Sequence, residues 1–371
     1  VVRFWGAMKA ADVGNPAGPP SVPLKASIIA VARQLFLHEK FARCTAQRSR
    51  YVAHLAVFVF YMAEAIFAAS WFHNWRYAQE TQLVEVLANP PDMLIQTLLL
   101  RFRPPTLDIL RRIEATTPSL KFRFSEAAAG ADYYREHGKS MPDTTIKLCE
   151  EADAILLAAC GLPSVRYPDN TEIMPQVELR FIFDLYAGVR PARLIPGVPS
   201  PIVGADMHGI DFVLIRESTE GLFASMGKGV VTHDDARETL VITRKTCERL
   251  FDFSLRIAER RKARGRKGLL TCVDKANAFK AYAFFRSIFD ERARNFPGVS
   301  TDHVYVDACA AQLVRRPWDF DVMVMENMFG DILSDLAAGL IGGLGIAPSA
   351  DIGDKHAVFQ PCHGTAPDIM R

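Results

Sequence analysis

The sequence predicts an α/β domain from Leu107 onward, because segments with helical periodicity alternate there with short apolar segments. Residues 107–115, LDILRRIEA, have the spacing of an amphipathic helix, and residues 120–127, LKFRFSEA, have a strand pattern. A helix is expected at 143–152, followed by the apolar strand Ala154–Ala159. The composition, 49% apolar and 23% charged, is ordinary for a globular protein.

Two further elements continue this alternation. Ile210–Ile215 is expected to be a short buried strand after Gly209, and Arg237–Arg260 has the periodicity of a long helix. The basic run 259–268, ERRKARGRKG, is most simply the solvated end of that helix and its turn. No aromatic or base-reading motif accompanies the run and the net charge is only +2, so nucleic acid is not an expected partner.

The cysteines are scattered through the sequence without a C-x-x-C pair. The seven positions are 44, 149, 160, 247, 272, 309 and 362. This distribution favours small buried thiols over disulfides and suits a reducing compartment. We therefore expect a cytoplasmic protein, unless the N-terminal segment directs the chain to an organelle or a membrane.

The first hundred residues differ from the rest. Residues 1–50 carry eight Lys or Arg against two acidic residues and include NPAGPPSVP, so partial disorder is expected. Residues 55–72, LAVFVFYMAEAIFAASWF, form an apolar segment interrupted by Glu64. Its length approaches that of a membrane span, but a charge near the centre costs about 2.5 kcal/mol or more. A membrane helix, a buried or partner-packed helix, and an unrelated extension all stay open.

The segment 326–353, ENMFGDILSDLAAGLIGGLGIAPSADIG, carries the strongest chemical signal. Asp331 and Asp335 lie four residues apart in a helical pattern, which places both carboxylates on one face. The other face is expected to be buried by Ile332, Leu333, Leu336 and Leu340. Like charges so placed repel each other unless a cation lies between them, and hard divalent ions prefer carboxylate oxygens. The pattern therefore predicts a site for a divalent metal ion.

Five other motifs occur in a consistent order along the chain. They are Arg180 with DLYAGVRP, which contains Arg190; RESTEG from Arg216; VDKAN with Lys275 and Asn277; VDA with Asp307; and HGTAPD from His363. Together with the aspartate helix, these motifs resemble the β-decarboxylating dehydrogenases, the isopropylmalate and isocitrate dehydrogenase family. The resemblance extends from near Leu107 to the last residue, roughly seven tenths of the chain.

The resemblance implies an α/β fold with an isopropylmalate dehydrogenase-like sheet domain at 105–371. A smaller dimerisation domain would be inserted at about 186–341, and residues 1–104 would be an unrelated N-terminal extension. The family opens with a strand and a G-D-G-I-G-P-E turn, whereas this chain has LLLRFRPPT before Asp108, so the sheet is expected to lack its first strand. The family also continues beyond the position of Arg371, which is therefore not expected to be a natural end.

A malate-type substrate carries two carboxylates and an alcohol, and a guanidinium group can pair with a carboxylate through two hydrogen bonds. By resemblance, the substrate carboxylates bind three arginines, Arg180, Arg190 and Arg216. Mg²⁺ or Mn²⁺ would be held by Asp307, Asp331 and Asp335. The metal ion would acidify the alcohol and stabilise the charge that develops during decarboxylation.

The resemblance also assigns roles to the lysine motif. Lys275 is the candidate base for the alcohol proton, and Asn277 would contact the substrate. In the family, the lysine and the third metal carboxylate enter the site from the other subunit of a homodimer. Lys275 and Asp307 are therefore expected to complete the active site of a second copy of this chain.

Two positions depart from the family pattern. Seven residues after the third arginine the family usually has a tyrosine that helps to protonate the decarboxylated intermediate, and this chain has Phe223, which cannot donate a proton. Water or another acid, such as Lys228, would take that role. Isopropylmalate enzymes place paired leucines before the first arginine, where this chain has Gln176 and Val177. Tartrate, malate or an isocitrate-type substrate is therefore an open alternative.

The cofactor prediction depends on one loop. The family does not use the G-x-G-x-x-G fingerprint, and the sequence has none in a strand-turn-helix setting. The loop comprises His363, Gly364, Thr365, Ala366, Pro367 and Asp368. Because Asp368 can accept hydrogen bonds from a ribose diol and would repel a 2′-phosphate, NAD is expected rather than NADP.

The resemblance thus implies an oxidoreductase of leucine biosynthesis. It would oxidatively decarboxylate a 2-hydroxy diacid of the 3-isopropylmalate type with NAD and Mg²⁺ or Mn²⁺. A second hypothesis is an inactive truncated or membrane-tethered relative that keeps the dimer-forming fold. That hypothesis follows from the expected loss of the first strand, the early end of the chain, and Phe223.

Overall fold

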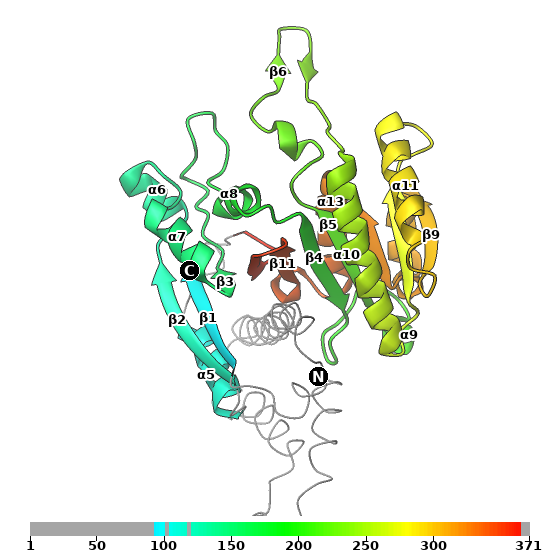
Figure 1. Cartoon of the computed structure of the whole chain (residues 1–371), viewed down its shortest axis with the longest axis horizontal. Helices are drawn as coiled ribbons and strands as arrows, with labels where there is room; N and C mark the ends of the chain where they lie inside the picture. The colour runs from blue at the N-terminus through cyan, green and yellow to red at the C-terminus, as the bar shows by residue number, and fades with distance from the viewer. Residues whose placement is uncertain (1–92, 101–103, 117–119, 365–371) are drawn as a thin grey trace, which may run out of the picture. The chain divides into compact units, whose positions relative to one another are not determined.

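A computed structural model describes residues 93–100, 104–116 and 120–364 of the chain (Figure 1). Within these residues, ten strands form one sheet in the order β2-β1-β3-β12-β11-β4-β5-β10-β8-β9. Helices pack on the sheet, so the fold is α/β as the sequence predicts. The apolar segment 55–72 lies outside the described residues. In the part of the chain that is described, no helix has the length and apolar character needed to cross a bilayer.

The sheet strands are β1 (Met93–Leu100), β2 (Leu120–Ala127), β3 (Ala154–Leu157), β4 (Ala187–Arg193), β5 (Asp211–Glu217), β8 (Leu269–Asp274), β9 (Ser300–Tyr305), β10 (Val322–Met325), β11 (Pro348–Ile352) and β12 (Ala357–Pro361). A separate hairpin pairs β6 (Val230–Val231) with β7 (Ala236–Arg237). The helices are α5 (Pro104–Thr116), α6 (Ala131–His137), α7 (Asp143–Glu151), α8 (Pro175–Ile182), α9 (Ala205–His208), α10 (Arg244–Ala263), α11 (Lys280–Ala293), α12 (Val306–Arg315) and α13 (Asn327–Leu340).

The prediction that the sheet lacks its first strand is wrong. β1 lies between β2 and β3 and pairs with both in parallel, with Leu100 opposite Ala127 and Leu157. A parallel strand between two neighbours favours a nearly continuous apolar run, and MLIQTLLL provides one. The strand therefore forms although the glycine-rich turn of the family does not follow it. β1 lies on the N-terminal side of the predicted domain boundary at 104.

Most other predicted elements are present with shifted ends. The apolar strand β3 ends at Leu157, two residues earlier than expected. The helix expected from Arg237 begins instead at Arg244, because Thr243 caps it by accepting a hydrogen bond from the backbone N–H of Thr246 at 3.3 Å. The preceding residues are held in the β6–β7 hairpin, which removes them from the helix.

The basic run 259–268 ends α10 as predicted, but one of its arginines is structural. Arg261 donates from Nε to Asp321 at 2.5 Å and from Nη2 to Asp211 at 3.0 Å. These ion pairs join the end of α10 to the sheet. The described cysteines are free thiols, as predicted, and all but Cys362 are buried.

Different helices cover the two faces of the sheet around β5 and β10. Val213 and Ile215 of β5 pack with apolar residues of α10 and α11 in one core cluster. Because successive side chains of a strand point to opposite faces, Arg216 points the other way, toward α13. The alternation thus places one of the predicted substrate arginines beside the aspartate helix.

We predict that Leu100→Ala destabilises the protein by about 2–5 kcal/mol, because Leu100 is fully buried in the cluster that joins β1 to β3 and α7. Urea unfolding would measure the change. Val314→Ala on α12, where the side chain is 49% exposed, is the control and should change stability by less than about 0.5 kcal/mol. Equal effects of the two substitutions would show that β1 is not an integral strand.

Candidate functional site

A cleft with a volume of about 400 Å³ brings together residues from α8, β4, β5, α13 and the segment after β12. Most of the residues predicted from the sequence line it. They are Gln176, Val177, Arg180, Arg190, Arg216, Phe223, Asp331, Asp335, His363 and Gly364. The rest of the predicted cofactor loop, from Thr365 to Asp368, lies outside the described residues.

The three predicted arginines are all buried at the base of this cleft. Arg180 of α8, Arg190 of β4 and Arg216 of β5 are 6%, 6% and 4% exposed. Burial, together with the neighbouring positive charge of Arg180, lowers the pKa of Arg216 to about 10. Three buried cations so close together require fixed acceptors around them, since an unpaired buried charge costs several kcal/mol.

Arg216 finds its acceptors on α13. Asn327 Oδ1 accepts from Arg216 Nε at 2.9 Å and from Nη2 at 2.7 Å, and Asp331 pairs with Nη1. Gly330 makes this approach possible, because a Cβ atom there would lie 2.6 Å from the Cβ and Cγ atoms of Arg216. The glycine in ENMFGD therefore has a packing reason that the sequence pattern did not indicate.

Asp351 of β11 holds the other two arginines, and sequence reasoning missed it. Its Oδ2 accepts from Arg180 Nε at 2.9 Å and from Gln360 Nε2 at 2.7 Å, and its Oδ1 accepts from Arg190 Nη2 at 3.3 Å. Burial opposes ionisation of this carboxyl, but Arg180 and Arg190 outweigh it and hold the pKa of Asp351 below its ordinary value. The sequence did contain one signal of this role, an aspartate within the short, mostly apolar strand segment PSADI.

The two aspartates of α13, Asp331 and Asp335, both line the cleft. Glu326 begins the helix by accepting from the backbone N–H groups of Met328 and Phe329, both at 3.1 Å. Asp331 and Asp335 are exposed one turn apart. Burial and the charge of Asp331 raise the pKa of Asp335, as two carboxylates one helical turn apart disfavour each other's ionisation. Their hard oxygen donors fit Mg²⁺ or Mn²⁺.

The predicted apolar face of α13 needs one correction. Leu333 and Leu340 are buried and Leu336 is half-buried, but Ile332 is 61% exposed. Ile332 directly follows Asp331, and in a helix of 3.6 residues per turn it lies outside the stripe that meets the sheet. The side chain is therefore available for contact with another surface.

The lysine motif lies apart from the cleft in the single chain. Lys275 follows β8, and its Nζ atom lies 2.6 Å from Oδ1 of Asp307 in the first turn of α12. Lys275, Asn277 and Asp307 are not among the lining residues of the cleft. Across the described residues of one chain, Asp307 also does not join Asp331 and Asp335 within metal-binding distance.

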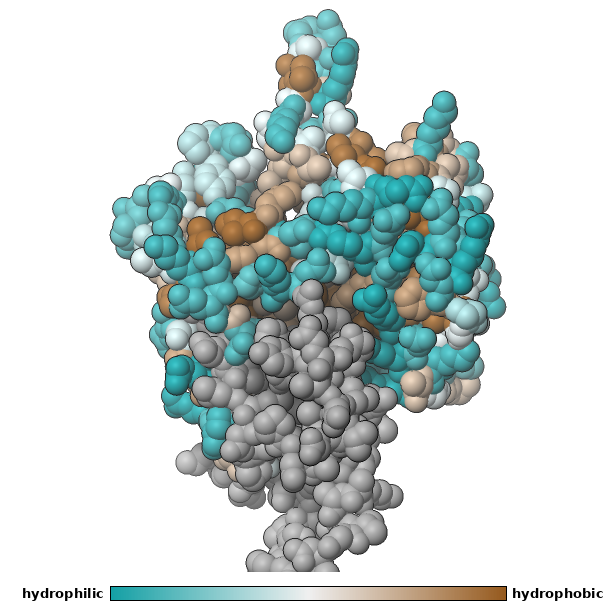
Figure 2. All heavy atoms as spheres, in the orientation of Figure 1, coloured by the Kyte–Doolittle hydropathy of each residue, from teal (hydrophilic) through white to brown (hydrophobic). Residues whose placement is uncertain are grey.

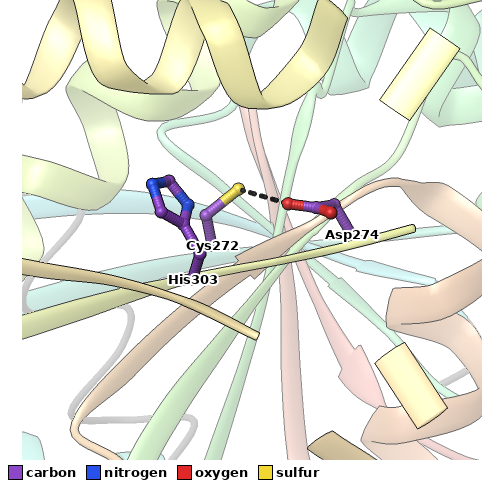
Figure 3. Close-up of side chains that lie close together, drawn as sticks. All are labelled: Cys272, Asp274 and His303. Carbon is purple, nitrogen blue, oxygen red and sulfur yellow. Dashed lines mark hydrogen bonds between the residues drawn. The ribbon is translucent and has the colours of Figure 1, made fainter. Parts of the chain in front are cut away.

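A second group of potential ligands lies between β8 and β9 (Figure 3). Cys272, Asp274 and His303 converge there, and the thiol of Cys272 lies 3.8 Å from Asp274 Oδ2. The carboxylate of Asp274 is already held by Arg286, with both oxygens 2.7–2.8 Å from its nitrogens. Burial raises the pKa of the Cys272 thiol well above its ordinary value. The group is therefore a structural ion pair with a buried thiol.

Phe223 and Ser349 provide two further contacts within the cleft. The guanidinium carbon of Arg216 lies 5.2 Å from the ring centroid of Phe223, so the ring offers a cation–π contact and no hydroxyl. Ser349 of β11 lines the same cleft, and its Oγ atom is buried with no hydrogen-bond partner among the residues that the structure describes. A buried hydroxyl without a partner suits contact with a bound ligand.

Comparison with known proteins agrees with this fold. The protein family model described as isocitrate/isopropylmalate dehydrogenase matches residues 104–371. A 3-isopropylmalate/3-methylmalate dehydrogenase of Methanocaldococcus jannaschii is 42% identical over 270 residues, which are 72% of this chain and 74% of that protein. An isocitrate/homoisocitrate dehydrogenase of Thermus thermophilus is 42% identical over 260 residues, 70% of this chain and 73% of that protein.

Among solved structures, isocitrate dehydrogenase from Methylococcus capsulatus matches with a TM-score of 0.62 and 34% identity, covering 74% of this chain and 79% of that chain. The protein is thus an oxidoreductase of the decarboxylating dehydrogenase class. More particularly, the chain belongs to the isocitrate/isopropylmalate dehydrogenase family. A second family model, described as OpgC protein, matches residues 36–112, most of which lie outside the described residues.

We predict that Asp331→Ala weakens Mn²⁺ binding by at least about tenfold, which corresponds to about 1.4 kcal/mol. The side chain is 53% exposed, and Asn327 continues to accept two hydrogen bonds from Arg216 without Asp331, so the fold should be retained. Calorimetric titration would measure the affinity, with Glu136→Ala on the exposed surface of α6 as the control. Unchanged Mn²⁺ affinity in Asp331→Ala would remove the metal-site assignment.

Proposed function

We propose that the protein oxidatively decarboxylates a 2-hydroxy diacid of the 3-isopropylmalate type, with NAD and Mg²⁺ or Mn²⁺. The observation that carries this proposal is a cleft in which three buried arginines lie beside two carboxylates one helical turn apart. Guanidinium groups suit an anionic substrate, and the carboxylates suit a hard divalent ion. When bound, the metal ion would polarise the hydroxyl and carbonyl oxygens and NAD would accept the hydride.

The residues of the chain would do the binding and the proton transfer. Arg180, Arg190 and Arg216 orient the substrate carboxylates from the base of the cleft, where burial excludes competing water. His363 and Gly364 line the cleft where the cofactor loop begins. The preference for NAD over NADP rests on Asp368, outside the described residues.

The lysine motif requires a second copy of the chain. Lys275 is the candidate base, yet it and Asp307 do not line the cleft of their own chain. In a homodimer with shared sites, the Lys275–Asp307 pair of one subunit would complete the cleft of the other. Figure 2 shows apolar side chains on the β6–β7 hairpin, where Val230 and Val231 are 57% and 80% exposed. Such exposure supports association between copies.

The alternative substrates stay within the same chemistry. Gln176 lies at the cleft beside the buried Val177, so a smaller or more polar group than isopropyl, as in tartrate or D-malate, is the second candidate. The hypothesis of an inactive relative loses one of its supports, because β1 is present in the sheet. Phe223 still supports it.

We predict that two inactive variants restore activity when mixed. Lys275→Ala and Asp331→Ala should each lack turnover of 3-isopropylmalate with NAD and Mn²⁺. After joint unfolding and refolding, random pairing makes half of the dimers mixed, and each mixed dimer has one intact site of two, so about a quarter of the original activity should return. Production of NADH measures the outcome.

The matched control for this experiment mixes Lys275→Ala with Asp307→Ala. Both residues serve the cleft of the other subunit, so every site in the mixed dimer lacks one of them and no activity should return. Recovery in the control, or none in the Lys275→Ala and Asp331→Ala mixture, would contradict the shared site. Inactivity of the unaltered protein with every diacid would contradict the function itself.

We predict that Phe223→Tyr accelerates proton delivery to the decarboxylated intermediate. General acid catalysis is worth on the order of 10² to 10⁴ in rate where that step limits turnover. Hydride transfer should change less. Rapid-mixing measurements of NADH formation and carbon dioxide release separate the two steps. No change in either would show that another acid, such as Lys228, or water has the role.

A further inference from the structure

Asp351 is a permanent counter-ion inside the cluster of substrate arginines. It is completely buried, and it does not line the cleft; it lies behind Arg180 and Arg190. Its two oxygens accept from both arginines and from Gln360. The carboxylate is thus held by three partners and cannot leave the cluster when a ligand binds.

The hydrogen bonds to Asp351 leave some N–H groups of Arg180 and Arg190 available to bind a ligand. Asp351 accepts a hydrogen bond from Nε of Arg180. No described residue is hydrogen-bonded to the two terminal nitrogens of that guanidinium. Arg190 donates from Nη2 to Asp351. Its Nη1 atom donates to the backbone oxygens of Val189 and Ala350, both at 3.2 Å. The carboxylate therefore fixes the orientation of both guanidinium groups.

The local charge follows from these contacts. The arginines carry three positive charges, and Asp351 removes one of them. Asp331 and Asp335 carry two negative charges, which a divalent ion bound between them would cancel. The partner subunit's Lys275 and Asp307 would cancel each other. Two buried carboxylates near Arg216 neither line the cleft nor form an ion pair with an arginine: Glu217 is bound by Asn327 and by the backbone amides of Thr219 and Glu220, and Glu326 by those of Met328 and Phe329. Among the groups that line the cleft or pair directly with its arginines, two positive charges are left.

We propose that Asp351 is a specificity-determining residue that makes the cleft selective for dianionic 2-hydroxy diacids over trianionic ones. The inference rests on the proposed function and narrows its substrate class. A dianion such as 3-isopropylmalate matches the two remaining charges, whereas isocitrate brings a third carboxylate. Gly188 of β4 leaves room for this arrangement, because a Cβ atom there would lie 3.1 Å from Asp351 Oδ1 and 2.6 Å from Ser218 Oγ.

The test compares two affinities in the full chain. Calorimetric titrations with 3-isopropylmalate and with isocitrate, at saturating Mn²⁺ and without NAD, measure binding in the absence of turnover. The neutral, equal-sized substitution Asp351→Asn leaves three positive charges facing the cleft. We expect Asp351→Asn to change the ratio of the two dissociation constants by about tenfold in favour of isocitrate binding, because it removes one negative charge beside the substrate carboxylates.

The matched control is Asp354→Asn, three residues further along the chain, where the aspartate side chain is 61% exposed. It should leave the ratio unchanged. An unchanged ratio in Asp351→Asn, or a shift toward 3-isopropylmalate, would overturn the proposal. A loss of both affinities by the same factor would also overturn it, because it would show a purely structural role.

If Asp351→Asn does not fold, Asp351→Ser provides the same comparison, since the smaller side chain leaves space for a formate ion. Added formate should then restore the preference for 3-isopropylmalate, and an absence of any formate effect on the ratio would contradict the charge argument. Adding NAD afterwards tests the proposed function separately. A shifted ratio without NADH formation would refute oxidative decarboxylation and leave the charge selectivity standing.

Discussion

The site depends on burying three guanidinium groups close together, two on strands of the sheet and one on α8. Each buried charge costs several kcal/mol unless it is paired and hydrogen-bonded, so the surrounding structure is arranged to supply acceptors. Asp351 holds Arg180 and Arg190, and Asn327 with Asp331 holds Arg216. The alternation of β5 directs Arg216 toward α13, and Gly330 allows the close approach that brings these acceptors within reach.

In the proposed function, the same arrangement would divide the chemistry between two copies of the chain. The cleft of one chain is lined by the three arginines and by Asp331 and Asp335. The candidate base Lys275 and the third carboxylate, Asp307, instead pair with each other where β8 ends and α12 begins. Because Asp307 is 69% exposed, this ion pair contributes little to stability, and the proposed function gives it a role in the site of another subunit.

Sequence patterns predicted the α/β class, most of the helices and strands, and the charged residues that line the base of the cleft. These predictions succeeded because the spacing of carboxylates on a helix and the position of an arginine in a motif are local properties of the sequence. β1 was missed because its apolar run lacks the expected turn, and pairing with β2 and β3 is a long-range property. Asp351 was missed because a single aspartate shows its role only when Arg180, 171 residues earlier, is brought beside it.

The charge state of Asp351 is the most direct test of this account. Carbon-detected NMR of the aspartate carboxyl groups, with the Asp351 resonance assigned by its loss in Asp351→Asn, would follow ionisation as the pH is lowered. The account predicts that Asp351 stays ionised below the ordinary aspartate pKa of 3.8, for as long as the protein remains folded, because Arg180 and Arg190 bind the anion. Proton uptake by Asp351 above pH 5 (about one unit higher) would contradict it.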